Sequence, residues 1–171
     1  MNTVLGGLDY GEKGSSILVT QTEHNSVLRP VYNLEQLREH SVLVVKCTIN
    51  GIVTEEALET AVRPDSRVLI VNHCSNVTGC VQDMEMIREF VKRHGLILIV
   101  DVSQSAGCIP VDADKWEADA LIFTGHKSLM GIQGTGGFYV RSGIELKPLK
   151  YGGTGRNSAQ LPTRTKTMSM K

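Results

Sequence analysis

The sequence predicts an α/β fold of three layers, in which a mostly parallel β-sheet lies between helices. Short apolar runs of β-strand character recur along the 171 residues, and each is followed by polar residues. Segments with helical spacing alternate with these runs. The segment at 83–94 shows this most clearly, because Met86, Ile87, Phe90 and Val91 fall on one face. Strands that alternate with such helices are typical of a parallel sheet covered on both sides.

Each expected element follows from a local pattern. We expect strands at 16–20, 41–46, 67–72, 95–101, 121–123 and 138–140, the last antiparallel to the rest. We expect helices at 2–8, from Ser26 to a limit at Pro30, from Thr54 to Val62 and from Asp83 to His94. The turns between them are marked by pairs such as Asn50-Gly51 and by Gly95 after a cationic last helical turn.

Charge and composition exclude several classes of protein. The 18 lysines and arginines balance the 18 aspartates and glutamates, so nothing indicates nucleic acid as a partner. No apolar run reaches the roughly 18 residues of a membrane span, and the N-terminus lacks a secretory signal pattern, so we expect a cytoplasmic protein with no membrane partner. The four cysteines lack Cys-x-x-Cys spacing, and we expect them to be reduced and mostly buried, without a metal site.

The stretch at 121–127 holds the first candidate for chemistry. Its apolar residues predict a buried strand, which ends in Thr-Gly-His-Lys. A buried strand that delivers an amine to a sheet edge desolvates it, which lowers the pKa of a lysine and makes it a nucleophile. A lone lysine at a strand end is more often exposed. The strand at 95–101 ends in Asp101, however, and adjacent parallel strands bring Asp101 and Lys127 to one edge, where α/β sheets bind ligands.

Several segments of glycine and polar residues follow the apolar runs in a defined order. They read Thr-Glu-His-Asn (22–25), His-Cys-Ser-Asn-Val-Thr-Gly (73–79), Asp-Val-Ser-Gln-Ser-Ala-Gly (101–107), Ala-Asp-Ala (118–120), Phe-Thr-Gly-His-Lys (123–127), Gly-Thr-Gly-Gly-Phe-Tyr-Val (134–140) and Tyr-Gly-Gly-Thr-Gly (151–155). In this order they resemble the class V aminotransferase family. That branch of the fold-type I pyridoxal-phosphate enzymes contains the cysteine desulfurases and selenocysteine lyases.

The resemblance implies pyridoxal 5'-phosphate as the cofactor and assigns three residues to its reactive parts. Lys127 is implied to hold the cofactor as an internal aldimine and to shuttle the alpha proton of the substrate. Asp101 is implied to keep the ring nitrogen protonated, although a strand-end aspartate also caps the turn that follows. His24 is implied to stack on the ring and to act in catalysis, although it also stands where a helix begins.

Four further residues are implied as cofactor contacts. Gln104 and Asn76 match positions near the phenolic oxygen of the cofactor, and Asn76 also lies near the substrate carboxylate in the family. Thr124 and His126 match positions that hold the cofactor phosphate. No metal site is implied.

The implied reaction converts cysteine to alanine and passes the sulfur on as a persulfide. Selenocysteine is the other candidate substrate, and a sulfur acceptor protein and a homodimer are the expected partners. A different reaction on the same cofactor, such as transamination, stays open. A second class also stays open: a cofactor domain that is catalytically silent. The persulfide-carrying cysteine of the desulfurases matches none of the four cysteines here, so we expect weak or absent turnover.

The same resemblance predicts how the chain is divided. Family members are longer, so we expect residues 1–155 to be a cofactor-binding large domain that lacks the phosphate loop at its start. We expect residues 156–171 to be an irregular tail and the small C-terminal domain to be absent. Arg156 follows a segment that passes toward the partner subunit in these dimers, where it either binds an anion or lies in solvent.

Overall fold

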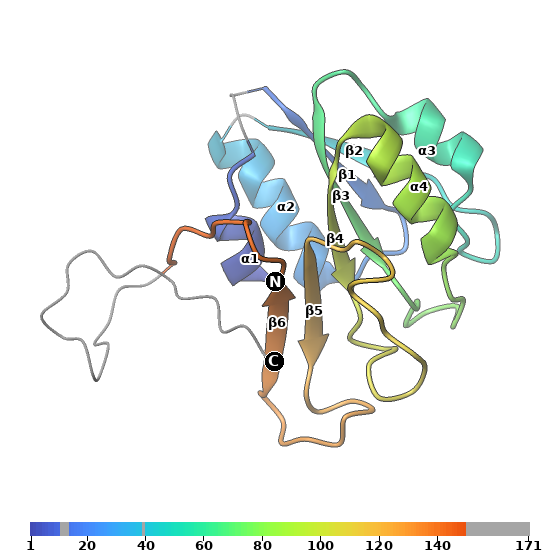
Figure 1. The fold of residues 1–171 in the computed structure, drawn as a ribbon, viewed down its shortest axis with the longest axis vertical. Helices are drawn as coiled ribbons and strands as arrows, with labels where there is room; N and C mark the ends of the chain where they lie inside the picture. The colour runs from blue at the N-terminus through green and yellow to red at the C-terminus, as the bar shows by residue number, and fades with distance from the viewer. Residues whose placement is uncertain (11–13, 39, 150–171) are drawn as a thin grey trace, which may run out of the picture.

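A computed structural model describes residues 1–10, 14–38 and 40–149 of the chain (Figure 1). In this part of the chain one six-stranded sheet has the strand order β2-β1-β3-β4-β5-β6. The first five strands are parallel, and β6 is antiparallel to β5. The strands are β1 (Ser16–Thr20), β2 (Ser41–Val45), β3 (Ser66–Asn72), β4 (Ile97–Asp101), β5 (Ala120–Thr124) and β6 (Gly136–Val140). The expected mostly parallel sheet, with an antiparallel last strand, is confirmed.

Helices cover both faces of the sheet, as Figure 1 shows. They are α1 (Asn2–Gly7), α2 (Asn25–Arg38), α3 (Glu55–Ala61) and α4 (Met84–His94). One apolar cluster joins α1 and α2 to one face of the sheet, through residues such as Ile70 and Ile99. A second cluster joins α3 and α4 to the other face, through residues such as Leu69 and Val100. The strands are apolar on both sides because the sheet is buried between these two layers.

The ends of α3 and α4 are where the sequence predicts them, because each is marked by a residue with a specific backbone role. Thr54 Oγ1 accepts a hydrogen bond from the Ala57 amide at 3.2 Å. Asp83 Oδ1 accepts hydrogen bonds from the first-turn amides of α4, at 3.0 and 3.1 Å. Gly95 ends α4 with φ of 61°, a left-handed conformation that a side chain disfavours. These caps satisfy backbone groups that have no partner within the helix.

The expected limit of the second helix at Pro30 is wrong. Helix α2 runs from Asn25 to Arg38 and contains Pro30 in its interior. Proline lacks an amide hydrogen and so removes one helical hydrogen bond. The helix continues because Val27, Val31 and Leu34 are buried against the sheet, at 0%, 0% and 5% exposure. Burial of this apolar stripe outweighs the lost hydrogen bond.

Four further expectations concern the cysteines, a metal site, a membrane span and the C-terminal tail. Cys47, Cys74 and Cys80 are free but only half-buried, and Cys108 is free and exposed, so the expectation that most of them are buried is wrong. Within residues 1–10, 14–38 and 40–149, no group of histidine, cysteine and acidic side chains is arranged to hold a metal ion. No helix of this part combines the length and apolar character needed to cross a membrane. The expected tail at 156–171 lies outside the described residues.

Candidate active site

The parallel strands end together at one edge of the sheet, and the sequence-predicted site residues lie at or just beyond these ends. Because β1, β3, β4 and β5 run in the same direction, the loops that follow them emerge side by side. Each predicted residue belongs to one of these four ends. His24 follows β1, Asn76 follows β3, Asp101 and Gln104 end and follow β4, and Thr124, His126 and Lys127 end and follow β5.

Asp101 and Thr124 share one face of the sheet. Asp101 pairs in register with Ile122, and Thr124 lies two residues beyond Ile122, so all three side chains point to the face covered by α1 and α2. Asp101 is only 7% exposed, and its Oδ1 accepts a hydrogen bond from the Ser103 amide at 2.8 Å. The aspartate therefore does cap the turn after β4. This contact uses one of its two carboxylate oxygens.

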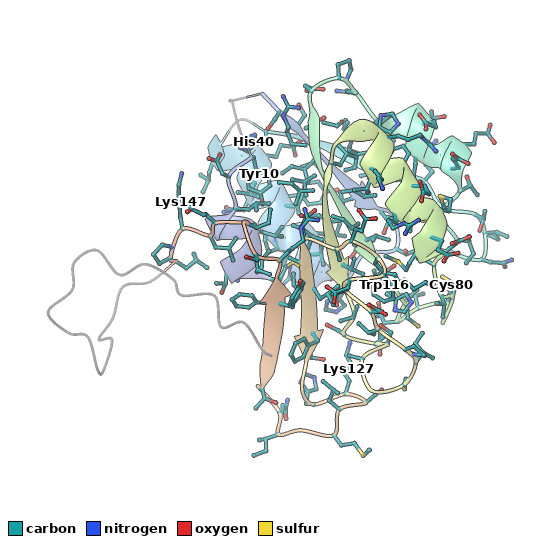
Figure 2. The ribbon with its side chains drawn as sticks, viewed as in Figure 1. Tyr10, His40, Cys80, Trp116, Lys127 and Lys147 are labelled. Carbon is teal, nitrogen blue, oxygen red and sulfur yellow. The ribbon has the colours of Figure 1, made fainter. Side chains whose placement is uncertain are left out.

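Lys127 lies three residues beyond β5, in a half-buried position (Figure 2). The turn after β4 packs against the loop that carries it. Cys108 Sγ donates a hydrogen bond to Ser128 Oγ at 2.9 Å. Gly107, with φ of 89°, approaches the Ser128 backbone so closely that a Cβ atom there would lie 2.8 Å from its carbonyl oxygen. These contacts hold the loop of Lys127 beside the turn of Gln104.

His24 stands at the start of a helix, as one of its two sequence interpretations predicts. Its carbonyl oxygen accepts hydrogen bonds from the Val27 and Leu28 amides, so it is the residue at which α2 begins. Its exposed ring uses Nδ1 to accept a hydrogen bond from the Ser26 amide at 3.1 Å. In a neutral imidazole with Nδ1 as acceptor, the proton lies on Nε2. The ring is thus oriented by the helix start and keeps one N–H group for another partner.

The remaining three predicted residues differ in burial. Gln104 is half-buried in the turn after β4. Asn76 and His126 are exposed. Asn76 lies in a turn in which Ser75 Oγ accepts hydrogen bonds from the Val77 and Thr78 amides, at 3.2 and 3.3 Å. That turn brings Asn76 to the same edge of the sheet without burying it.

Sequence reasoning missed Glu23, which is buried at this edge with 7% exposure. The pKa of the Glu23 carboxyl is raised to about 8, mainly by burial and also by the nearby Asp101 carboxylate. The hydrogen bond from Thr20 Oγ1 and the nearby backbone amide of Asn72 act in the opposite direction and lower this pKa. The available signal was the motif at 22–25, in which an acidic residue directly follows a buried strand and its first turn.

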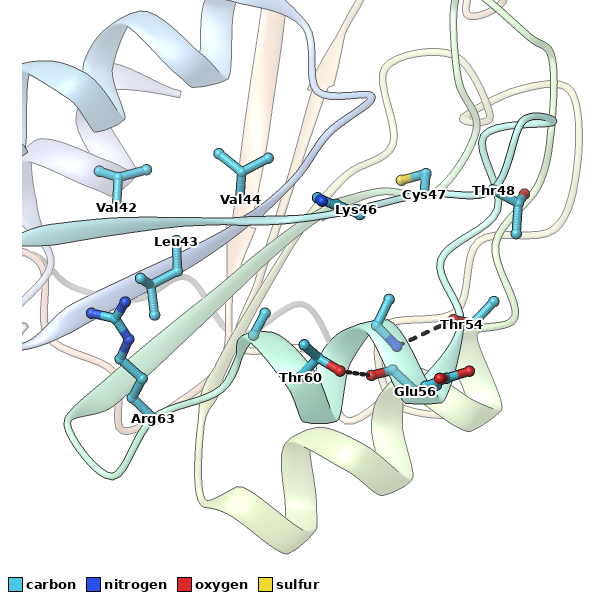
Figure 3. A pocket seen from close by; sticks show the side chains of 12 residues that line it. Val42, Leu43, Val44, Lys46, Cys47, Thr48, Thr54, Glu56, Thr60 and Arg63 are labelled. Carbon is cyan, nitrogen blue, oxygen red and sulfur yellow. Dashed lines mark hydrogen bonds between the residues drawn. The ribbon is translucent and has the colours of Figure 1, made fainter.

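The two best-formed pockets lie away from this edge. One, of about 600 Å³, lies between the edge strand β2 and α3 and is lined by residues such as Val42, Lys46, Ala57 and Arg63 (Figure 3). The other, of about 900 Å³, borders α1 and α2. Neither contains a predicted site residue. The candidate site is therefore an open edge rather than one of these cavities.

Pyridoxal phosphate fits the residues at this edge. The hydroxyl Oγ1 of Thr124 is buried without a hydrogen-bond partner, and a buried hydroxyl in that state is costly unless a ligand supplies a partner. A phosphate accepts hydrogen bonds from such a donor. Asp101 offers a buried carboxylate on the same face, and Lys127 offers a primary amine from the neighbouring loop. This cofactor requires a hydrogen-bond acceptor for its ring nitrogen and an amine that reacts with its aldehyde.

With this geometry in place, comparison with known proteins identifies the family. A family model described as aminotransferase class-V matches residues 1–170. The chain belongs to the class V aminotransferase family, as the motifs indicated. The match spans nearly all of the sequence.

Two curated relatives are named as cysteine desulfurases. The chain is 37% identical over 158 residues to the cysteine desulfurase IscS of Serratia proteamaculans, covering 90% of this chain and 39% of the relative. It is 38% identical over 155 residues to a probable cysteine desulfurase of Methanothermobacter thermautotrophicus, covering 90% of this chain and 38% of the relative. The chain therefore spans about two fifths of the length of these curated relatives.

Two solved structures share the fold. A cysteine desulfurase from Thermococcus onnurineus NA1, solved in its apo form, matches with a TM-score of 0.77 and 32% identity over 82% of this chain and 35% of that one. A lysine-to-alanine mutant of C-DES, with glycine covalently linked to its PLP cofactor, matches with a TM-score of 0.81 and 30% identity. That match covers 89% of this chain and 41% of the solved chain. The α/β fold of this chain is that of these two solved neighbours.

Proposed function

We propose that this chain binds pyridoxal phosphate at the strand-end edge and supplies the large-domain part of a cysteine desulfurase-like enzyme. The observation that carries the proposal is the arrangement at the ends of β4 and β5. There a buried carboxylate, a buried hydroxyl without a partner and a lysine come from neighbouring strands. Supporting it are the family membership and the names of relatives such as the cysteine desulfurase IscS.

Each residue at this edge has a defined task in that proposal. When bound, the cofactor supplies an aldehyde that links to amines and a ring that accepts electrons. Lys127 provides the amine that holds the cofactor and then moves the alpha proton of the amino-acid substrate. The Asp101 carboxylate accepts a hydrogen bond from the ring N–H. His24 covers the ring, and its Nε2 is the nitrogen free to exchange a proton, because Nδ1 is engaged with Ser26.

The other four contacts bind and orient. Thr124 Oγ1 and the His126 imidazole donate hydrogen bonds to the phosphate. Gln104 donates from its amide to the phenolic oxygen of the cofactor, and Asn76 reaches the same region and the substrate carboxylate. The substrate would be cysteine, whose sulfur would pass to an acceptor thiolate as a persulfide while the rest of the molecule leaves as alanine; selenocysteine is the other candidate. A homodimer and a sulfur acceptor protein complete the proposal for the intact enzyme.

Absorption spectroscopy tests the cofactor site directly. The purified chain mixed with pyridoxal phosphate is expected to gain a near-visible absorption band, and Lys127→Ala is expected to lose it. Lys115→Ala is the matched control, because Lys115 is an exposed lysine whose ion pair with Glu85, at 3.3 Å, lies outside the site. Equal spectra for the wild-type chain and Lys127→Ala contradict the proposal.

A second candidate function is a cofactor-binding domain without turnover. The position of the two best-formed pockets away from this edge favours it, because a site outside a closed cavity excludes water poorly. Adding cysteine and a thiol reductant to the cofactor-loaded chain, and measuring alanine together with the sulfide that the reductant releases from persulfide sulfur, separates the two functions. We expect turnover to be very weak or absent, while cofactor binding persists. Sulfide and alanine formed in equal amounts, and only when Lys127 is present, favour the desulfurase.

A further inference from the structure

Glu23 is a buried acid for which the proposed function has no use. It follows β1, is 7% exposed, and its amide donates a hydrogen bond to the Thr20 carbonyl oxygen at 3.2 Å. Its Oε1 accepts a hydrogen bond from Thr20 Oγ1 at 2.6 Å. Its Oε2 is buried and has no hydrogen-bond partner. A charged carboxylate in this position lacks the donors that stabilise a buried negative charge.

Asp101, at the end of a strand separated from β1 by β3, is the acidic group that acts electrostatically on Glu23. It ends β4, and the electrostatic effect of its carboxylate on Glu23 is repulsive. The Asn72 amide at the end of β3 also interacts with Glu23, and the α-amino group of Met1 at the start of α1 lies within electrostatic reach of Asp101. The adjacent His24 imidazole is bonded to Ser26 through Nδ1. Glu23 and Asp101 therefore form the acidic pair at this edge.

The surroundings of the two carboxyls differ in a way that decides which one holds the proton. Asp101 Oδ1 accepts a hydrogen bond from the Ser103 backbone amide at 2.8 Å. Glu23 has one side-chain bond from a neutral hydroxyl and one buried oxygen without a partner. Two carboxyl groups with such different surroundings take different protonation states at the same pH. Burial also raises the pKa of Glu23 to about 8.

We propose that Glu23 and Asp101 form a carboxyl pair in which Glu23 holds the proton and Asp101 holds the charge. Glu23 is then a positioning residue, because its neutral form leaves the negative charge on the Asp101 carboxylate, which is the group proposed to accept a hydrogen bond from the pyridine nitrogen of the cofactor. This role toward the cofactor rests on the proposed function. Occupation of Asp101 by a protonated ring nitrogen would cancel its repulsion of Glu23, so cofactor binding and the protonation of Glu23 are coupled.

Titration of Glu23 without cofactor tests the pair. NMR of labelled glutamate side-chain carboxyl carbons follows each acid with pH, and Glu23→Gln identifies the signal. We expect a midpoint near pH 8 in the wild-type chain and a lower one in Asp101→Asn, whose amide oxygen still accepts from the Ser103 amide. A midpoint near the ordinary value of 4.5, or one that Asp101→Asn leaves unchanged, overturns the pair.

Titration with pyridoxal phosphate tests the link to the ring. We expect the cofactor to lower the Glu23 midpoint in the wild-type chain and to leave it unchanged in Asp101→Asn. The absorption band shows whether the cofactor binds. If it binds and the Glu23 titration midpoint stays the same or rises, the coupling between cofactor binding and Glu23 protonation is overturned, but the proposed function is not. No binding by the wild-type chain overturns the proposed function and the link together, and the cofactor-free titration still decides the pair.

Discussion

Three buried polar atoms near the ends of the parallel strands lack hydrogen-bond partners: Glu23 Oε2, His73 Nδ1 and Thr124 Oγ1. A buried polar group without a partner costs stability, and the cost is much larger when the group is charged. His73 avoids a buried charge, because burial lowers the pKa of its ring, which lies edge-on to Trp116 at 4.5 Å between centroids. Glu23 avoids one by holding a proton. The Thr124 hydroxyl is neutral in any case, so a ligand is what would supply the partner that it lacks.

Glu23 makes the stability of the chain depend on pH. Its pKa rises from 4.5 in the unfolded chain to about 8 in the folded chain, so between these values the folded state binds the extra proton. The free energy of unfolding is therefore highest below pH 4.5 as far as Glu23 is concerned. It falls by on the order of 1 kcal/mol per pH unit toward pH 8.

Urea unfolding of the wild-type chain and Glu23→Gln across this range measures the effect. The glutamine side chain is neutral at every pH, so the difference between the two chains is expected to shift in favour of Glu23→Gln as pH rises. Glu56→Gln, at an exposed position on α3, is the control and should follow the wild type. A constant difference between wild type and Glu23→Gln contradicts a neutral Glu23.

Helix α2 shows how packing overrides a local rule. Its interior proline costs one backbone hydrogen bond, yet the helix runs for 14 residues because its apolar stripe is buried against β1 and β3. The helix also orients His24, whose carbonyl oxygen accepts its first hydrogen bonds. The placement of a site residue thus depends on a helix that the local pattern alone would have ended early.

Pro30→Ala is expected to stabilise the chain by about 1–2 kcal/mol, since alanine restores the amide that can donate to the Ser26 carbonyl. The gain is below the full cost of an interior proline, because proline also restricts the unfolded chain. Urea unfolding measures the difference, and Arg29→Ala, at the exposed neighbouring position, is the control. Loss of stability in Pro30→Ala would mean that the proline supports the helix through its packing.

The whole sheet creates the site, since no segment contains it. Residues from four strand ends, separated by as many as 103 positions between His24 and Lys127, meet only because the strand order places β1, β3, β4 and β5 in succession. Parallel direction then puts all four ends at one edge. Helices on both faces hold the strands in register.

Cofactor binding to such a preformed edge is expected to stabilise the whole chain. At a pyridoxal phosphate concentration about 100 times the Kd, the melting temperature should rise by roughly 5–10 °C for a domain of this size. Lys127→Ala and Asp101→Asn should each reduce the rise, because each removes one proposed contact. Inorganic phosphate is the control, and an equal rise with phosphate alone would attribute the effect to a bound anion.

Several features followed from the sequence because their causes are local. Strand and helix spacing, the caps at Thr54 and Asp83 and the glycine at 95 depend on neighbours within a few residues, and they predicted the layered fold. The ordered motifs predicted the family, which comparison confirmed. The roles of the site residues stay predictions.

Other features were decided only by tertiary structure, because burial and electrostatic coupling depend on residues far apart in the chain. The continuation of α2 through Pro30 depends on a core formed with the sheet. The raised pKa of Glu23 depends first on burial and also on Asp101, which lies 78 positions later and comes near only when β1, β3 and β4 pair. Local patterns carry no information on such distances, so the sequence determined the elements and the motifs, and the packed sheet decided which acid keeps its proton.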